Sequence, residues 1–261
     1  ILSSGFSGAR SYLRRGEMPP APNPTGPQKA TLLSVPFFHA TGCHAILNPS
    51  LVAGAKLVMQ KKFDAGEALK LIEAERITSA GGVPTIAWQI LTHPDRDKHD
   101  LSSLEAIAYG GAPSAPELVR QIGAAGAAPG NGWGMTETSA TFSHHMAEDY
   151  LNRPDSCGPP VAVCDAQVRS PDGQVLPPDT VGELYGFGPN IVKGYWNKPE
   201  ATDETFPDGW VRSGDLARID AEGFITIVDR AKDMLIRGGE NIYCVEVEGV
   251  LCEHPAVMDA A

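Results

Sequence analysis

Helix and strand patterns alternate between residues 63 and 124, and this alternation limits the possible folds more than any other feature. An amphipathic helix is predicted over 63–76, because Asp64 and Glu67 have the spacing of a capping box at its start. Three apolar residues at helical spacing share one face, which we expect to be buried: Ala68, Leu69 and Ile72.

The same region continues with a short strand at 77–80, a helix over 84–92 that begins at a proline, and an apolar strand at 104–109. A second capping box, Ser114 with Glu117, opens another helix after a glycine turn. Repetition of strand, turn and helix predicts a mostly parallel sheet covered by helices.

After about residue 159 the pattern changes to short β-type runs. The predicted strands are 161–168, 182–187, 210–213 and 224–228. The dipeptides between them are typical of hairpin turns: Asp172-Gly173, Asp208-Gly209 and Glu222-Gly223. This rhythm predicts a small antiparallel, β-barrel-like subdomain.

Three parts are therefore expected, and the fold class is α/β plus β. An α/β subdomain covers 1–158, an antiparallel β subdomain covers 159–229, and the beginning of a small α+β domain covers 230–261. A charged cluster at 229–233 marks the second boundary, and a helix is predicted over 245–253. Both ends are expected to be incomplete, because the sequence does not begin with Met and the last part is too short to fold alone.

The chain of 261 residues has a formal net charge of −11, from 21 basic and 32 acidic side chains. Negative charge repels nucleic acids and anionic membranes, so no nucleic-acid partner is expected. No apolar run reaches the roughly 18 residues that a membrane span needs. Five cysteines without a C-x-x-C pair favour reduced thiols and a cytoplasmic location. None of these features indicates an oligomeric state.

One run, Gly132-Trp133-Gly134-Met135-Thr136-Glu137, holds the groups that a nucleotide site needs. An aromatic plane stacks on a base, a hydroxyl donates to a phosphate oxygen, and a carboxylate binds a metal ion. The two glycines let backbone approach a ligand. The same pattern occurs in ordinary turns, so a structural interpretation stays open. Asp215 follows a predicted strand, where its carboxylate accepts either ribose hydroxyls or its own backbone amides.

The order of segments resembles that of the adenylate-forming enzymes, a family that includes acyl-CoA synthetases, luciferases and the adenylation domains of peptide synthetases. The resemblance runs from about residue 31 to the end of the chain. The matching segments are Phe37-Phe38-His39, Tyr109 to Pro113, Gly132 to Glu137, Gly182 to Leu184 with Gly194 to Trp196, Ser213 to Leu216, and Arg230 to Asp233 with Gly238 to Ile242.

This resemblance implies a site for ATP or AMP and Mg²⁺. It places Trp133 against the adenine ring, Asn131 beside the adenine amino group, Thr136 at the α-phosphate and Glu137 at the magnesium ion. Most relatives have tyrosine at the stacking position, so we expect stacking to remain and any bond from a phenolic hydroxyl to be absent. The other implied nucleotide-binding positions are Gly110, Gly111, Ala112, Pro113, Gly132, Gly134 and Met135.

Further roles follow from the same resemblance. Asp215 and Arg230 would hold the ribose, and His39 would line the entrance of the carboxylate pocket. Lys232 has the hinge position about which the C-terminal domain rotates between two steps. A core histidine and a surface lysine are the structural alternatives for His39 and Lys232. Two glycines would let the thiol arm of coenzyme A pass: Gly238 and Gly239.

The implied reaction activates a carboxylic acid with ATP to an acyl-adenylate and then transfers the acyl group to coenzyme A. The Met-Thr-Glu form of the nucleotide motif and the run at 238–243 favour fatty or aryl acids. Two alternatives stay open. One is an adenylating enzyme with another acceptor, such as a carrier protein, and the other is a noncatalytic nucleotide-binding module.

Two elements that carry charge in the family are not found in this sequence: a phosphate loop ending in lysine and a catalytic lysine of the C-terminal domain. Loss of one preorganised stabilising group commonly costs about 10² to 10³ in rate. We therefore expect the 261 residues alone to be an inactive fragment that binds AMP or an acyl-adenylate weakly. A pyrophosphate-release assay checks this prediction, and steady release by the isolated chain would contradict it.

Overall fold

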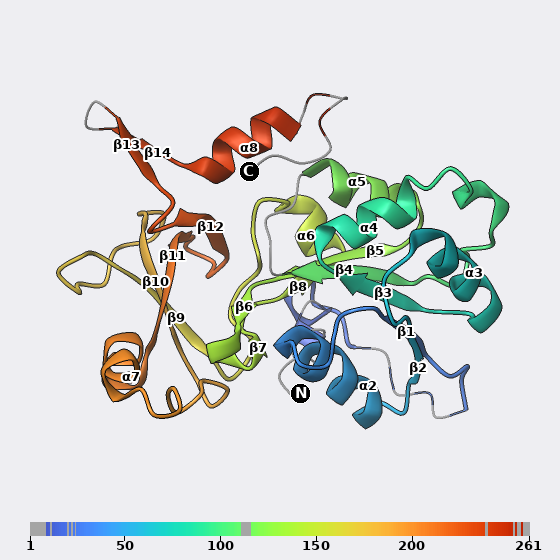
Figure 1. The fold of residues 1–261 in the computed structure, drawn as a ribbon, viewed down its shortest axis with the longest axis horizontal. Helices are drawn as coiled ribbons and strands as arrows, with labels where there is room; N and C mark the ends of the chain where they lie inside the picture. The colour runs from blue at the N-terminus through green and yellow to red at the C-terminus, as the bar shows by residue number, and fades with distance from the viewer. Residues whose placement is uncertain are drawn as a thin grey trace.

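A computed structural model describes residues 9–10, 12–19, 21, 23, 25–110, 116–237, 240–252, 254 and 257. Two main sheets, each with its own hydrophobic core, lie side by side, and a small hairpin and helix form the C-terminal part (Figure 1). This arrangement confirms the predicted fold class of a helix-covered, mostly parallel sheet followed by an antiparallel one. The domain boundaries at 158 and 229 stay predictions.

The larger sheet has the strand order β2-β1-β3-β4-β5-β8. All of its pairings are parallel except that of β8 with β5. Its strands are β1 (Ala30–Leu33), β2 (Lys56–Met59), β3 (Ser79–Gly82), β4 (Ala106–Gly110), β5 (Ala128–Gly132) and β8 (His145–Met146). The strand predicted at 77–80 begins two residues later, because the amide of Ile77 still bonds to the carbonyl of Ile72 at the end of the preceding helix.

Helices cover this sheet and supply its core. Four helices contribute apolar side chains to this core: α3 (Ala65–Glu75), α4 (Pro84–Leu91), α5 (Pro116–Ala124) and α6 (Glu148–Asn152). At the start of α3, the Asp64 carboxylate accepts a hydrogen bond from the amide of Glu67 at 2.8 Å, and the predicted apolar face is buried. The capping residue predicted for α5, Ser114, lies outside the described residues.

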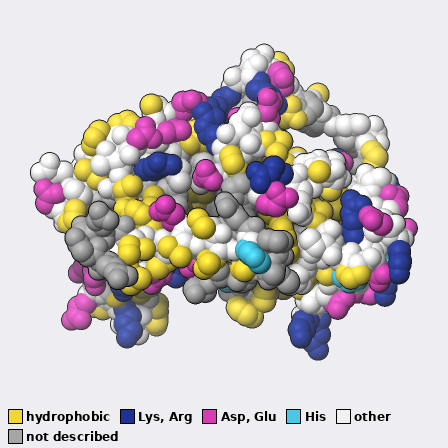
Figure 2. Space-filling model, turned by 90° about the horizontal axis from the view of Figure 1, so that it is seen from above, with side chains coloured by type: hydrophobic (Ala, Val, Ile, Leu, Met, Phe, Trp, Pro, Cys, Tyr) yellow, Lys and Arg dark blue, Asp and Glu magenta, His cyan; other side chains and the backbone are white. Residues whose placement is uncertain are grey.

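Three short helical elements without a sequence prediction complete this half. η1 (Thr41–Leu47) is a π-helix that packs against β1, and α2 (Asn48–Val52) continues it and packs against β2. η2 (Arg96–Lys98) is a single 3₁₀ turn after α4. On the face seen in Figure 2, acidic and basic side chains are interspersed, which matches surface ion pairs such as Arg76 with Asp100.

The second sheet is antiparallel, with the order β12-β11-β10-β9. Its strands are β9 (Asp165–Arg169), β10 (Gly182–Phe187), β11 (Val211–Ile219) and β12 (Ile225–Arg230). Its buried core includes Phe142, Val168, Leu184, Ala217 and Ile225. The prediction of an antiparallel sheet in this region is therefore confirmed.

Three details of the predicted β rhythm are wrong. The strand predicted at 161–168 begins only at Asp165, because the amide of Cys164 bonds to the carbonyl of Val161 and closes a turn just before it. β11 continues past residue 213 because the chain passes Gly214 with φ +77° and a β-bulge near Leu216 without leaving the sheet. Asp208-Gly209 is no hairpin turn, because it lies in the 3₁₀ turn η4 (Pro207–Gly209) that joins α7 (Pro199–Thr205) to β11. The helix signal missed here is a proline in the first turn followed by Glu200.

The C-terminal part consists of β13 (Leu235–Arg237), β14 (Glu240–Ile242) and α8 (Cys244–Cys252). Its helix begins one residue before the prediction. The buried carboxylate of Asp229, at the end of β12, accepts a hydrogen bond from the amide of Cys244 at 2.7 Å and so anchors the start of α8. Across the part of the chain that the structure describes, every helix is too short or too polar to cross a bilayer.

Candidate nucleotide site

The predicted nucleotide segment begins at the carboxyl end of β5, inside the parallel sheet. Gly110, the last residue of β4, pairs with Gly132, the last residue of β5, and Asn131 lies beside Tyr109. Ligands of open α/β sheets bind outside the carboxyl ends of the strands. After β5 the chain forms the hairpin of β6 (Gly134–Met135) and β7 (Ala140–Thr141), joined by the 3₁₀ turn η3 (Thr136–Thr138).

The glycines of this segment are required by contacts with protein backbone. A Cβ atom on Gly134 would lie 1.7 Å from the carbonyl oxygen of Ala140, and one on Gly132 would lie 2.6 Å from that of Ser143. The sequence pattern predicted that these glycines let backbone approach a ligand. The structure corrects the physical reason: the space is filled by the returning strand of the hairpin.

Trp133 joins the two sheets. Its indole Nε1–H donates a hydrogen bond of 2.7 Å to Oδ2 of Asp215 on β11, which is 82 residues away in the sequence. Its ring meets Phe142 edge to face at 5.5 Å between centroids, and it packs on the core of the antiparallel sheet. A phenolic hydroxyl is absent, as expected, but the indole N–H makes a bond that the sequence did not predict.

Asp215 lies opposite Arg230 in the β11–β12 register. The nearest oxygen of Asp215 and Nε of Arg230 are 4.0 Å apart, and the arginine side chain is exposed. Burial raises the pKa of the Asp215 carboxyl above its ordinary value, although the Trp133 hydrogen bond and the Arg230 charge oppose this rise. In the described residues, no backbone amide donates to this carboxylate. Within these residues the alternative of a turn aspartate bonded to its own backbone is not observed, and the ribose role of Asp215 stays a prediction.

Thr136 and Glu137 lie at the tip of the hairpin. Thr136 is exposed, and Oε1 of Glu137 accepts a hydrogen bond of 2.6 Å from the hydroxyl of Tyr195. The backbone of Glu137 also accepts from the amide of Val192 at 2.9 Å. Burial raises the pKa of the Tyr195 phenol, and the carboxylate of Glu137 adds to the rise. Tyr195 lies in a segment that resembles the family, but its bond to Glu137 was not predicted.

Magnesium fits this position as a one-carboxylate site. The described residues contain no group of three or more His, Cys, Asp or Glu side chains that could hold a metal ion alone. Mg²⁺ in nucleotide enzymes commonly uses one or two carboxylates together with phosphate oxygens. Because Tyr195 engages only Oε1 of Glu137, the second carboxylate oxygen is left for such a cation.

Asn131 is buried at the end of β5. Its Oδ1 accepts from the amide of Gly132 at 2.8 Å, and its Nδ2 donates to the carbonyl oxygen of Ser156 at 3.3 Å. The same carbonyl accepts a hydrogen bond from Nε2 of His145 at 2.8 Å. The orientation of the carboxamide is thus set by the next residue of its own chain segment and by the carbonyl of Ser156.

Two predicted residues lie apart from these contacts. His39 is exposed, and its Nδ1 accepts from the amide of Thr41 at 3.1 Å, so the alternative of a core histidine is wrong. It precedes η1, which packs against β7 of the hairpin. Lys232 is exposed in the turn after β12, and its hinge role stays a prediction. Five predicted positions lie outside the described residues: Gly111, Ala112, Pro113, Gly238 and Gly239.

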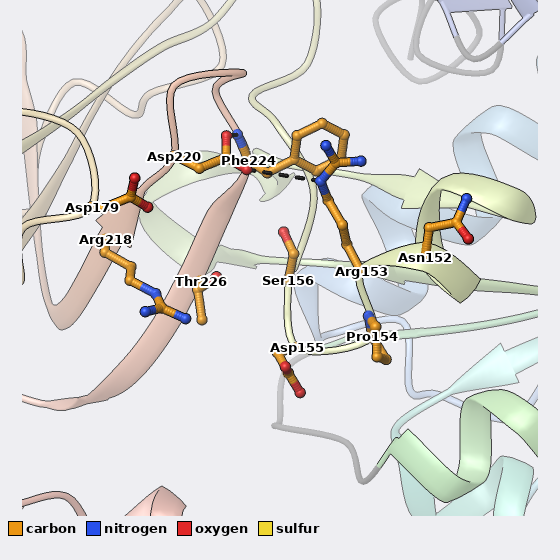
Figure 3. Close-up of a pocket in the computed structure, with 10 residues that line it drawn as sticks. All are labelled: Asn152, Arg153, Pro154, Asp155, Ser156, Asp179, Arg218, Asp220, Phe224 and Thr226. Carbon is orange, nitrogen blue, oxygen red and sulfur yellow. Dashed lines mark hydrogen bonds and ion pairs between the residues drawn. The ribbon is translucent and has the colours of Figure 1, made fainter. Parts of the chain in front are cut away.

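A separate cavity of about 310 Å³ lies between the segment 152–156, which follows α6, and the side of the antiparallel sheet formed by β11 and β12 (Figure 3). None of the predicted site residues lines it. Its wall is mostly polar and charged, and consists of Asn152, Arg153, Pro154, Asp155, Ser156, Asp179, Arg218, Asp220, Phe224 and Thr226. Of these lining residues, Ser156 also contacts the nucleotide segment, because its carbonyl accepts hydrogen bonds from Asn131 and His145.

Known proteins match this chain in sequence and in fold. Residues 9–196 match the model of a family described as AMP-binding enzyme. The chain is 40% identical to a feruloyl-CoA synthase of Amycolatopsis over 87% of its length and 46% of the relative's. It is 38% identical to a medium/long-chain-fatty-acid–CoA ligase of Mycobacterium tuberculosis, over 87% of this chain and 40% of that one.

Among solved structures, o-succinylbenzoate coenzyme A synthetase of Bacillus subtilis in complex with ATP and magnesium aligns with a TM-score of 0.82 and 33% identity. The alignment covers 98% of this chain and 51% of that one. The chain thus spans about half the length, or less, of the relatives it matches.

The hairpin contact of Gly134 generates a stability prediction. Gly134→Ala forces a methyl group onto the Ala140 carbonyl, so we expect the free energy of unfolding to fall by about 1–3 kcal/mol. Gly123→Ala on α5 is the matched control, because its nearest neighbour is a side-chain carbon of Leu151 at 3.5 Å. Helix propensity predicts a neutral or slightly stabilising effect there. Urea denaturation measures both, and equal effects would contradict the prediction.

The burial of His145 generates a pH prediction. Burial lowers the pKa of His145 to about 4, so the folded state keeps the ring neutral while the unfolded chain takes up a proton below its ordinary pKa of 6.5. Its contribution to stability is therefore complete above pH 6.5 and is lost as the pH falls toward 4. We expect the wild-type protein to lose about 3 kcal/mol more than His145→Gln between pH 7 and 4 in urea denaturation. Parallel pH profiles would contradict this.

Proposed function

Because this chain belongs to the AMP-binding enzyme family, we propose that it forms the nucleotide-binding part of an AMP-forming acid–thiol ligase. The proposed reaction joins a carboxylic acid to ATP and then to coenzyme A. The proposal concerns the whole protein, because this chain aligns with about half, or less, of the length of its relatives.

The hydrogen bond between Trp133 and Asp215 carries this proposal, because it brings a base-stacking surface and a ribose acceptor together. Asp215 accepts the hydroxyls of ribose through its carboxylate, and Arg230 lies beside it at the edge of the same strand pair. A carboxylate that remains partly desolvated gains from new donors, and ribose hydroxyls are such donors. ATP in a solved relative of the same fold supports this assignment.

The phosphates of the nucleotide then extend toward the tip of the β6–β7 hairpin. Thr136 is exposed there to donate its hydroxyl to the α-phosphate, and Glu137 is held in place by Tyr195. Magnesium, bound between Glu137 and the phosphates, would neutralise the charge of the triphosphate. Gly110, Gly132 and Met135 shape the surface beside it through their backbone.

The chemistry balances in two displacements. In the first, a carboxylate oxygen of the substrate bonds to the α-phosphorus, and the bond to pyrophosphate breaks. In the second, the sulfur of coenzyme A loses its proton to water and bonds to the acyl carbon, and AMP leaves with the electron pair of the broken carbon–oxygen bond. His39, exposed beside two phenylalanines and ahead of η1, is proposed to line the entrance for the acid. Lys232 is proposed as the hinge between the two steps.

A fatty or aryl acid is the proposed substrate, since both classes are named among the relatives. Another acceptor for the acyl group, such as a carrier protein, is the alternative for the second step. We also propose a cytoplasmic location, because the odd number of cysteines suits a reducing compartment.

The reaction is tested with the full-length protein, ATP, Mg²⁺, coenzyme A and a panel of fatty and aryl acids. The proposal predicts AMP formation that requires an acid and thioester formation that also requires coenzyme A. Pyrophosphate release without thioester would favour another acceptor. Nucleotide binding with no acid-dependent AMP would favour a noncatalytic module and contradict the ligase.

Asp215→Asn separates the role of this residue in binding from its role in folding. The carboxamide still accepts from Trp133, but it lacks the charge and the second acceptor that ribose needs. We expect ATP affinity to fall about 10- to 100-fold in calorimetric titration. We expect the unfolding temperature to be unchanged or higher, because a desolvated charge is removed.

Asp97→Asn is the matched control for this variant, because Asp97 lies in η2 with a side chain that is 89% exposed. It should change neither ATP affinity nor the unfolding temperature. Equal ATP affinity of Asp215→Asn and wild type would rule out the ribose contact.

A further inference from the structure

His145 is a buried histidine that the proposed reaction does not use. It is 3% exposed, and it lies in β8 directly opposite Asn131 in the antiparallel pairing with β5. Its ring packs between Tyr150, at 4.5 Å between centroids, and Phe224, at 5.9 Å. The ring therefore contacts α6 and the residue just before β12, while its backbone belongs to the strand next to the nucleotide segment.

One carbonyl oxygen receives the polar groups of both residues. Nε2 of His145 donates to the oxygen of Ser156 at 2.8 Å, and Nδ2 of Asn131 donates to the same oxygen at 3.3 Å. A carbonyl only accepts, so the proton of the ring is on Nε2, and Nδ1 has no partner among the residues that the structure describes. Within that part of the chain, the one hydrogen bond of the ring is with the group that orients Asn131.

Ser156 is held from the other side as well. Its hydroxyl donates to the carbonyl of Ile225 on β12 at 2.7 Å, and its side chain lies in the wall of the cavity of Figure 3. The carbonyl shared by Asn131 and His145 is therefore placed by both sheets. With its amide nitrogen bound there, Asn131 turns its Oδ1 toward the amide of Gly132, at the carboxyl end of β5.

We propose that His145 is a positioning residue for adenine recognition: it holds the Ser156 carbonyl so that Asn131 presents its carboxamide oxygen to the 6-amino group of the base. The inference rests on the proposed function, because it requires that adenine binds beside Asn131. A ring that stays neutral suits this role, and burial lowers the pKa of His145 to about 4. His145 touches no ligand and acts only through Ser156 and Asn131.

The test measures the affinity of the full-length protein for ATP and for the triphosphate of purine riboside, which lacks the 6-amino group. Wild type is expected to bind ATP about tenfold more tightly than this analogue. His145→Met removes the donor and keeps a buried apolar side chain of similar length. It is expected to lower ATP affinity about five- to tenfold and to leave analogue affinity unchanged.

Rescue and coupling complete the test. His145→Gln replaces the donor at a similar reach and is expected to restore most of the preference for ATP. Asn131→Ala is expected to abolish the preference, and adding His145→Met to it should change the preference no further. Thermal unfolding of each variant confirms that it is folded.

The outcomes separate the inference from the proposed function. Equal loss of both ligands in His145→Met, or an unchanged preference, would overturn the positioning role and leave the ligase proposal intact. If His145→Met does not fold, His145→Gln and Asn131→Ala still test the inference. Asn131→Ala that prefers ATP over the analogue as strongly as wild type does would also overturn the positioning role. A wild type that binds neither nucleotide would remove the proposed function itself.

Discussion

The hydrogen bond from the indole of Trp133 to the carboxylate of Asp215 is the contact on which the arrangement of the site depends. It connects the segment after β5, in the parallel sheet, to β11 of the antiparallel sheet. In the proposed function, base and sugar are parts of one nucleotide, so the surfaces proposed to bind them must have a fixed separation. The two sheets have separate cores, and a direct bond between site residues sets that separation at the place where it is needed.

The chain from 131 to 145 serves both halves of the molecule. Asn131 and His145 pair within the parallel sheet, while Trp133 and Phe142 belong to the core of the antiparallel one. The backbone can return this closely because Gly132 and Gly134 have no Cβ atom that would clash with it. This arrangement has an energetic cost at Asp215, because burial disfavours the charged form of its carboxylate and raises its pKa. A group kept in an unfavourable environment by its surroundings is typical of a binding site that is preorganised for its ligand.

Local patterns predicted the elements whose signals lie within a few residues. The cap at Asp64 and the apolar face of α3 were correct, as was the proline start of α4. β11 was predicted too short, because a glycine and polar residues interrupt its alternation while its pairing partners hold it in the sheet. β1 and β2 were not predicted from the sequence. Their positions follow from parallel pairing with strands more distant in the sequence.

The sequence by itself determined the kinds of chemistry present and their order along the chain: an aromatic plane, a hydroxyl with a carboxylate, and a distant aspartate. Only the tertiary structure decided that the indole bonds to that aspartate, that Tyr195 holds Glu137, and that His145 shares a carbonyl with Asn131. The physical reason is that periodicity and capping act over a few residues. Hydrogen bonds between distant segments form only after two sheets have packed and brought their edges together.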